Sequence, residues 1–259
     1  MSGGVLRVAV AGATGRTGSE AARALRAAEG IALVAAVARS RRGEDLGHAL
    51  GEAPWDLPLE SDVVAAIERT QPDVLVDFTL AEPAAMHARL ALERGVRPVI
   101  GATGLSGADV EGLRRLVGER GTGAALVPNF SFGVLLLNRF CREAARYFPA
   151  VEVVESHHVA KRDRPSGTAA RIARVLESAG ADAPVPVHSV RLPGLVAHHE
   201  VIFGGPGETL TIRHDTLHRS SFGPGVVLAA RRVMAMRGLA EDLEGLLAAT
   251  ENPRRASVG

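Results

Sequence analysis

Short apolar runs alternate with amphipathic stretches through the first half of the chain. The apolar runs show little polar alternation, which is the pattern of strands buried on both faces of a parallel sheet. Each run precedes a stretch with a helical period. The strand-like runs are residues 5–12, 31–39, 73–80 and 97–104, and the helix-like stretches are residues 19–30, 62–71, 84–95 and 110–121. This rhythm predicts strand–helix–strand units, and therefore an α/β fold with a Rossmann-like parallel sheet.

The pattern changes after about residue 128. The strand-like runs at 151–156, 187–204 and 208–216 lie close together, and helical periods are expected at 134–147, 168–178 and 226–249. The run GGPGE between two of these strands has glycines that suit a tight antiparallel turn. We therefore predict a second domain of α+β type.

The two domains are expected to divide the chain in three pieces. Residues 1–128 and 226–259 form the dinucleotide-binding domain, because the last helical period packs back on the first domain. Residues 129–225 form the second domain. We expect the final run, ENPRRASVG, to be a frayed end.

Composition restricts the class of partner. The chain of 259 residues carries 30 Lys and Arg against 29 Asp and Glu, so no long-range field attracts it to nucleic acid or to an anionic membrane. No apolar run approaches the ~20 residues of a membrane span, and the start of the chain lacks the features of a secretory leader. We expect a soluble, cytoplasmic protein with neither nucleic acid nor membrane as partner.

A glycine-rich turn links the first predicted strand to the first predicted helix. Gly12, Gly15 and Gly18 follow the strand in a G-x-x-G-x-x-G spacing, with Val10 where the commoner fingerprint has its first glycine. Such glycines let the backbone approach a pyrophosphate, and the helix start offers free N–H groups to it. The alternative is a tight turn without ligand; we favour dinucleotide binding.

The second strand suggests which dinucleotide is bound. Ala38 stands where an NAD-binding fold often has an acidic residue for the ribose hydroxyl. Arg39, Ser40, Arg41 and Arg42 follow, and their guanidinium groups could hold a 2′-phosphate. The alternative is a solvated basic loop. We predict NADPH as the preferred cofactor, with NADH possible.

Two further turns end strands of the same predicted sheet, where ligands of open α/β folds gather. Asp77, Phe78 and Thr79 end one strand, and residues 101–104, GATG, end the next. Their small residues would let a nicotinamide or ribose approach the main chain. The alternative is ordinary loop chemistry, which is a stronger alternative for Asp77 than for the glycine turn.

Residues 155–169, ESHHVAKRDRPSGTA, concentrate candidate chemistry in the second domain. Ser166 can cap a helix, and the amides of Gly167 and Thr168 would then face an anion such as a carboxylate. His157 and Lys161 lie in a loop short enough for both to line one cavity, where they could protonate a substrate while clamping it. The charged residues 162–164 are interpreted as surface charges or structural ion pairs.

A metal site and a reactive cysteine are both disfavoured. His198 and His199 are adjacent on a predicted strand and so point to opposite faces, no Cys-x-x-Cys or His-Glu-x-x-His occurs, and Lys161 would repel a cation. The single cysteine, Cys141, lies in a stretch of helical period and excludes a disulfide within the chain. We predict no metal and a buried, structural thiol.

The motifs together resemble the dihydrodipicolinate reductase (4-hydroxy-tetrahydrodipicolinate reductase) family almost end to end. GATGRTG is similar to G-x-x-G-R-M-G, VDFT to D-F-[ST], GATG to G-T-T-G, and VPNFSFGV to A-P-N-F-S-x-G-V. The most specific match is HHVAKRDRPSGTA, which resembles H-H-x-x-K-x-D-A-P-S-G-T-A. The segment VIFGGPGETLTIRHDTLHRSSFGPGV also resembles the family's closing hairpin.

The resemblance implies a fold and a reaction. It implies a Rossmann-like first domain, a mixed-sheet second domain that binds the substrate and assembles a homotetramer, and a cleft that closes on NAD(P)H. The implied reaction removes water from a 4-hydroxy ring and then reduces the ring by hydride transfer, yielding tetrahydrodipicolinate for lysine and diaminopimelate synthesis. The small dicarboxylate substrate needs fixed positive groups, which this sequence supplies independently.

The resemblance also implies roles for individual residues. His157 matches the proton donor, Lys161 the second donor, His158 a substrate contact, and Gly167 with Thr168 the carboxylate site. The residues matching cofactor contacts are Gly12, Ala13, Thr14, Gly15, Arg16, Thr17, Arg39, Gly101, Ala102, Thr103, Val127, Pro128, Asn129 and Phe130.

Several positions depart from the family pattern. They are Thr17 for Met, Ala38 for an acidic residue, Ala102 for Thr, Leu135 for Asn and Arg164 for Ala. Ala38 weighs against NADH, and Arg164 leaves room for a related substrate. The alternatives are a reductase of the same fold acting on another small imino or carbonyl acid, and a nucleotide-binding scaffold without turnover.

Overall fold

The computed structural model describes residues 4–251 and separates them into two compact units. Unit 1 comprises the described residues up to Phe130 and from Phe222 onward, and unit 2 is Ser131–Ser221. Most of the predicted frayed end, residues 252–259, lies outside the described residues. Within the described range, no helix combines the length and the apolar character needed to span a membrane.

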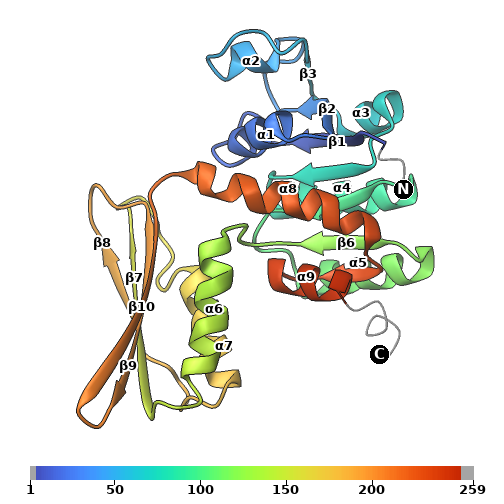
Figure 1. Ribbon diagram of the computed structural model, residues 1–259. Coiled ribbons are helices and arrows are strands. Elements are labelled where there is room, and N and C mark those ends of the chain that lie inside the picture. The colour runs from blue at the N-terminus through green and yellow to red at the C-terminus, as the bar shows by residue number, and fades with distance from the viewer. Residues whose placement is uncertain (1–3, 252–259) are drawn as a thin grey trace. The chain divides into compact units, whose positions relative to one another are not determined.

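Unit 1 is built on a seven-stranded sheet in which every pair of neighbours is parallel. The strand order is β11-β6-β5-β4-β1-β2-β3, and Figure 1 labels β6, β1, β2 and β3 of this sheet. The strands are β1 (Leu6–Ala11), β2 (Ile31–Val37), β3 (Leu59–Glu60), β4 (Val74–Asp77), β5 (Arg97–Ile100), β6 (Gly123–Leu126) and β11 (Gly238–Ala240). The predicted Rossmann-like parallel sheet is confirmed.

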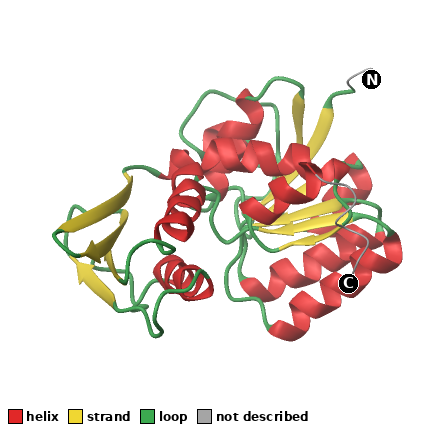
Figure 2. Cartoon of the chain, turned by 60° about the horizontal axis from the view of Figure 1, so that its bottom comes forward, coloured by secondary structure: helices red, strands yellow, loops and turns green. Residues whose placement is uncertain are grey.

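Helices cover both faces of this sheet (Figure 2). Helix α8 packs beside α1 and α9, and α4 packs beside α3 and α5. The helices are α1 (Gly18–Ala27), α2 (Leu46–Ala49), α3 (Val63–Thr70), α4 (Ala81–Glu93), α5 (Gly107–Arg120), α8 (Gly223–Arg232) and α9 (Leu243–Glu251). Because both faces are covered, Val8 and Val10 of β1 and Leu75 of β4 are completely buried, which explains the continuous apolar runs.

The prediction of one continuous helix over residues 226–249 is wrong for the middle of that range. Helix α8 ends at Arg232, a 3₁₀ turn spans Val233–Ala235, and β11 then pairs with β6 before α9 begins. Gly238 has a φ of 91°, which a right-handed helix does not allow. A strand of three residues is too short to show its own periodicity, so the flanking helical periods concealed it.

Unit 2 contains a mixed four-stranded sheet with the order β10-β9-β7-β8. Its strands are β7 (Ala150–His157), β8 (Val187–Arg191), β9 (Ala197–Gly205) and β10 (Glu208–Thr216). β7 and β8 are parallel, whereas β9 pairs antiparallel with both β7 and β10. The predicted tight turn joins β9 to β10 at Pro206 and Gly207, and the latter has a φ of 81°.

Helices α6 (Phe132–Ala144) and α7 (Gly167–Ser178) lie on one face of this sheet, and a 3₁₀ turn, Arg219–Phe222, follows β10 (Figure 1). Strand alternation turns Val151 and Val153 of β7 toward the helices, where they meet Val201 and Phe203 of β9. Cys141 of α6 belongs to the same core, and burial raises the pKa of its thiol to about 12. The predicted structural role of this cysteine is confirmed.

Shortening a side chain in this core should destabilise the protein. Ile172 of α7 is fully buried, so Ile172→Val removes one methylene from a packed site and should lower the free energy of unfolding by about 0.5–1.5 kcal/mol. The measurement is the midpoint of denaturant unfolding. Val5→Ala is the control: Val5 is 58% exposed, so we expect a change within about 0.5 kcal/mol. Equal midpoint shifts in the two variants would contradict the described core.

Candidate active site

The predicted cofactor residues of unit 1 lie at one edge of its sheet. Parallel strands end at the same edge, and the strand order reverses between β1 and β4, which is where dinucleotides bind in such sheets. Residues 12–17 follow β1, Arg39 follows β2, residues 101–103 follow β5, and residues 127–130 follow β6. The structure therefore brings these separate sequence motifs together.

The glycine turn has the close backbone packing that its sequence predicts. Gly12 has a φ of 74°, and its N–H donates to the carbonyl of Val37 at 2.9 Å. A Cβ on Gly12 would lie 2.8 Å from the carbonyl oxygen of Phe78, and one on Gly18 would collide with the carbonyl oxygen of Gly12. Thr17 precedes α1 without a side-chain capping bond, so the helix start keeps amides for an anion. These features fit the pyrophosphate of a dinucleotide.

The turn after β4 is braced by a buried carboxylate. Asp77 is 1% exposed and accepts from the Thr79 amide at 2.7 Å and from Nδ1 of His87 at 2.7 Å. The ring of Phe78 fills the space above Gly101 and lies 5.4 Å from the ring of Phe130. Asp77 therefore stabilises the conformation of the turn. His87 was missed from the sequence, because it lies within α4, ten residues beyond Asp77.

The arginines of the basic cluster after β2 have different environments. Arg41 has a φ of 70°, pairs with Glu44 at 2.8 Å, and donates to the carbonyl of Ala49 at 2.8 Å. Arg39 and Arg42 are exposed. Arg39 lies two residues beyond the end of β2 and makes no ion pair with any side chain the structure describes, so its guanidinium is available to a ligand.

In unit 2, His157 occupies the end of β7 and is buried, with 6% of its surface exposed. Its Nδ1 is hydrogen-bonded to Oε2 of Glu155, two residues earlier on the same face of the strand. Burial lowers the pKa of His157, Glu155 opposes that effect, and the cations Lys161 and Arg191 add to it. The imidazole is therefore held between one anion and two cations.

Glu155 is completely buried and has a partner at each oxygen. Arg191 of β8 donates from Nη1 to Oε2 at 2.9 Å and from Nη2 to Oε1 at 2.7 Å, and the amide of Ser166 donates to Oε1 at 3.2 Å. Burial alone would raise the pKa of Glu155, but hydrogen bonds, first from Arg191 and then from Ser189 and His157, lower it to about 2. The carboxylate is therefore ionised at neutral pH.

Sequence reasoning assigned no role to Glu155 or Arg191. Strand alternation offered a signal for Glu155, since it shares a strand face with Val153 and His157. Arg191 lies directly opposite His157 in the β7–β8 register, 34 positions later in the chain. A register between two strands cannot be read from one sequence.

The loop between β7 and α7 carries the predicted lysine. Lys161 Nζ lies 2.8 Å from each carboxylate oxygen of Asp163. Its hydrogen bond is the first cause that lowers the pKa of Asp163, and the amide of Gly167 also contributes. Arg191 holds this loop by donating to the carbonyls of Lys161 at 3.2 Å and Asp163 at 2.7 Å. The interpretation of Asp163 as an ion-pair residue is confirmed.

Helix α7 begins beside the same carboxylate. Ser166 is its N-cap, as predicted, and its hydroxyl accepts from the amide of Ala169 at 3.2 Å. Gly167 and Thr168 are the first two residues of the helix, and His158 follows His157 as a half-buried side chain. The structure therefore gathers His157, Lys161 and the start of α7 around one buried ion pair.

A second imidazole packs against His157. The ring of His199 on β9 meets it edge-on at 5.4 Å between ring centres. Burial lowers the pKa of His199 to about 3, so this ring is neutral, and neither nitrogen has a hydrogen-bond partner in the described part of the chain. Within residues 4–251 there is no group of three or more His, Cys, Asp or Glu side chains that could hold a metal ion.

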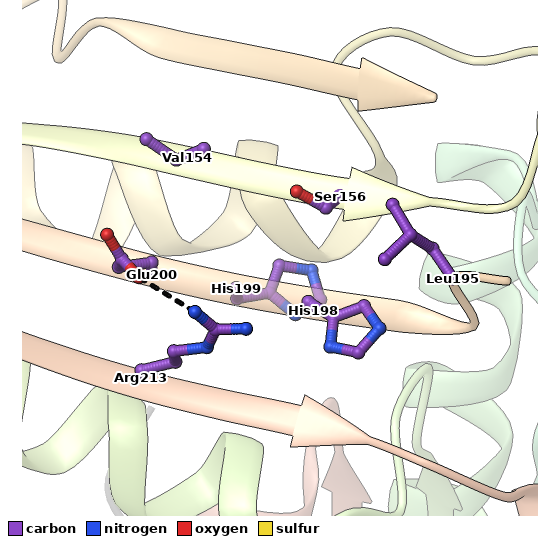
Figure 3. Close-up of a pocket in the computed structure, with 7 residues that line it drawn as sticks. All are labelled: Val154, Ser156, Leu195, His198, His199, Glu200 and Arg213. Carbon is purple, nitrogen blue, oxygen red and sulfur yellow. Dashed lines mark hydrogen bonds and ion pairs between the residues drawn. The ribbon is translucent and has the colours of Figure 1, made fainter. Parts of the chain in front are cut away.

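A pocket in unit 2 lies on the opposite side of the sheet from His157. Figure 3 shows Val154 and Ser156 of β7 beside His198 and Glu200 of β9 and Arg213 of β10. On β7 these side chains alternate with Glu155 and His157, so they point to the other face. An ion pair at 3.4 Å joins Arg213 to Glu200. His199, whose ring packs against His157, also lines this pocket, so the pocket adjoins the site around His157 through that one side chain.

Unit 1 has a parallel sheet with a glycine-rich turn at its carboxyl edge, and unit 2 presents a buried histidine and a lysine. These features define a two-domain dinucleotide-dependent oxidoreductase. Two family models match this chain: "Dihydrodipicolinate reductase, N-terminus" over residues 6–130 and "Dihydrodipicolinate reductase, C-terminus" over residues 133–247. The chain belongs to the dihydrodipicolinate reductase family. It is an NAD(P)H-dependent oxidoreductase of lysine and diaminopimelate biosynthesis.

Individual relatives agree with this assignment. The 4-hydroxy-tetrahydrodipicolinate reductase of Moorella thermoacetica is 46% identical, over 93% of this chain and 98% of the relative. That of Geobacillus thermodenitrificans is 43% identical, over 93% and 99%. The dipicolinate-bound dihydrodipicolinate reductase from Paenisporosarcina sp. TG-14 superposes with a TM-score of 0.81 and is 34% identical, over 93% of this chain and 98% of that one. The resemblance drawn from the sequence motifs is confirmed.

Proposed function

We propose that unit 1 binds NADPH and that unit 2 binds 4-hydroxy-tetrahydrodipicolinate and protonates it during its dehydration and reduction to tetrahydrodipicolinate. The observation that carries this proposal is the buried Glu155–Arg191 pair, which contacts His157, the Lys161 loop and the start of α7. When bound, NADPH supplies the hydride. The residues of this chain supply orientation, charge and protons.

The carboxylate-binding role belongs to Lys161, His158 and the first amides of α7. Lys161 Nζ and the Gly167 amide both interact with the Asp163 carboxylate, so the loop already presents two donors to one carboxylate. A substrate carboxylate would make the same kind of contacts in exchange for Asp163, and Thr168 would extend the site. The dipicolinate bound by the Paenisporosarcina relative, itself a ring dicarboxylate, supports this assignment.

His157 is proposed to donate the proton from Nε2. Its Nδ1 is engaged by Glu155, which leaves Nε2 as the nitrogen able to exchange a proton with the substrate. Burial lowers the pKa of His157, but a doubly negative substrate beside the ring favours the imidazolium and so raises that pKa on binding. Lys161 is the second donor, available to the departing hydroxyl or to the reduced ring.

The cofactor is proposed to contact residues 12–17, 101–103 and 127–130, which end three strands of one sheet. The collision that any Cβ on Gly18 would cause with the carbonyl of Gly12 supports the close packing of turn and helix that dinucleotide-binding folds use. Arg39 is proposed to hold the 2′-phosphate, which favours NADPH over NADH. The engaged position of Arg41 restricts this role to the neighbouring arginines.

Changing Arg39 should alter cofactor preference. The loss of a charge-assisted hydrogen bond in Arg39→Ser should lower kcat/KM for NADPH about tenfold and leave kcat/KM for NADH within about twofold. Arg115→Ser, which removes an exposed arginine of α5, is the control and should change neither value. An NADH preference in the unmodified enzyme, or an equal loss for both cofactors in Arg39→Ser, would overturn the assignment.

We also propose that the protein is a cytoplasmic homotetramer assembled through unit 2. The observation that supports an interface there is the sheet of unit 2, whose face opposite α6 and α7 carries no helix in the described part of the chain (Figure 1). Light scattering on the purified enzyme should give four times the mass of one chain. A monomer mass at assay concentration would refute tetramer formation.

The proposed reaction is tested by a coupled assay. The product of dihydrodipicolinate synthase is generated in place, NADPH oxidation is followed by absorbance, and tetrahydrodipicolinate is identified by mass spectrometry. We expect one product molecule per NADPH oxidised. Absence of oxidation above background would favour a nucleotide-binding scaffold, and turnover only with other imino or carbonyl acids would favour a related reductase.

A further inference from the structure

The ion pair between Glu155 and Arg191 connects every part of the site in unit 2. Oε2 of Glu155 accepts from His157, and Oε1 accepts from the amide of Ser166 at the start of α7. Arg191 spans both oxygens and also donates to the carbonyls of Lys161 and Asp163 in the loop. The acid, the lysine loop and the carboxylate-binding helix start therefore depend on one pair of side chains.

We infer that Glu155 is a positioning residue of the reaction, fixing His157 with its proton on Nδ1 and holding its Nε2 as the proton-donating atom. This inference rests on the proposed function, in which His157 is the acid. Nδ1 must carry the proton because an ionised carboxylate only accepts hydrogen bonds. Arg191 fixes Glu155 in turn, since its two donors match the two carboxylate oxygens.

The charges around His157 give Glu155 a second effect. The described groups that face the imidazole are Glu155 on its own strand, Lys161 in the loop, Arg191 on β8 and the neutral ring of His199 on β9. Glu155 is the anion that contacts the ring, and it opposes the two cations. Removing its negative charge destabilises the imidazolium, so the acid form of His157 would be lost at a lower pH.

A buried ion pair alone does not require this arrangement. Replacing such a pair by apolar side chains is often neutral or stabilising, so stability gives little reason for a carboxylate beneath the histidine. One carboxylate oxygen of Glu155 accepts a hydrogen bond from the imidazole of His157, and the other accepts from the amide of Ser166, just before Gly167. Glu155 therefore fixes the position of the acid relative to the position of the substrate carboxylate.

The test is Glu155→Gln, which keeps the size and removes the charge. We expect kcat at neutral pH to fall about tenfold and the basic limb of the kcat–pH profile to move to lower pH by about one unit, with KM for NADPH unchanged. The basic limb moves to lower pH because His157 acts as an acid: a lower pKa means that its protonated form is lost at a lower pH. A fall in kcat that is equal at every pH, or an unchanged profile, would overturn the inference.

The control is Glu143→Gln. Glu143 is an exposed carboxylate of α6 in the same unit, and its ion-pair partner is Arg146 at 3.2 Å. We expect its pH profile to match that of the unmodified enzyme. A shift equal to that of Glu155→Gln would assign the effect to charge in general and would overturn the positioning role.

A second measurement does not depend on turnover or on the folding of the Glu155 variant. Long-range ¹H–¹⁵N spectra of the unmodified enzyme labelled at histidine report which nitrogen of neutral His157 carries the proton, with His157→Gln used for assignment. We expect the Nδ1–H tautomer. A predominant Nε2–H tautomer would refute the inference even if the proposed reaction is correct, and an Nδ1–H tautomer in an enzyme inactive in the coupled assay would show that the proposed function had failed instead.

Discussion

Replacing His157 with alanine is expected to lower kcat by roughly 10²-fold or more in the coupled assay. The physical reason is the loss of a positioned acid. The ring is buried at the end of β7, and Glu155 and Arg191 fix its orientation, so water entering the vacated space would not be held in a comparable position. Because unit 1 is unaffected, KM for NADPH should change less than about threefold, as expected when a group acts mainly in the transition state.

The control for this prediction is His188→Ala. His188 also pairs with a glutamate, Glu152, in the same sheet, but its side chain is 56% exposed. We expect nearly full activity from that variant. Full activity in His157→Ala would remove the histidine from the mechanism, and a comparable loss in His188→Ala would indicate damage to the sheet.

Replacing Lys161 with alanine is also expected to lower kcat by roughly 10²-fold, and here KM for the dicarboxylate should rise as well. Lys161 has two proposed tasks, carboxylate binding and proton donation, so ground-state and transition-state contacts are lost together. The variant also leaves Asp163 without its ion-pair partner, which places an uncompensated negative charge where the substrate carboxylate would bind. That repulsion adds to the rise in KM.

Two companion variants separate these effects. Arg162→Ala removes an exposed cation from the neighbouring position and should leave kcat within about twofold. The double change Lys161→Ala with Asp163→Asn removes both charges. It should bring KM for the dicarboxylate part of the way back to the value of the unmodified enzyme, but it should not restore kcat. A full recovery of kcat in the double variant would contradict proton donation by Lys161.

Much of unit 1 could be predicted from the sequence because each of its features is local. Strands buried on both faces leave continuous apolar runs, and the turn glycines stand beside the strand and helix that they join. The strand β11 escaped prediction because Gly238–Ala240 is too short for a period. Its place in the sheet comes from pairing with β6, which lies more than 100 residues earlier.

The site in unit 2 could be predicted only in part for a related reason. His157, Lys161 and the start of α7 lie within one short stretch, so their proximity followed from the chain itself. Arg191 comes from another strand, and His199 comes from a third, so their contacts with this stretch depend on the registers of β7 with β8 and β9. The residues that position His157 are therefore harder to predict from the sequence than His157 itself.

His157 and Lys161 are proposed to supply the protons for reduction of the ring dicarboxylate. The most direct test is the rate of tetrahydrodipicolinate formation, measured by mass spectrometry with NADPH and the product of dihydrodipicolinate synthase, for the unmodified enzyme and for the double variant His157→Ala, Lys161→Ala. We expect one product per NADPH in the unmodified enzyme and a rate lower by at least about 10²-fold in the double variant. Equal rates in the two proteins, or NADPH oxidation without tetrahydrodipicolinate, would refute this role of the two residues.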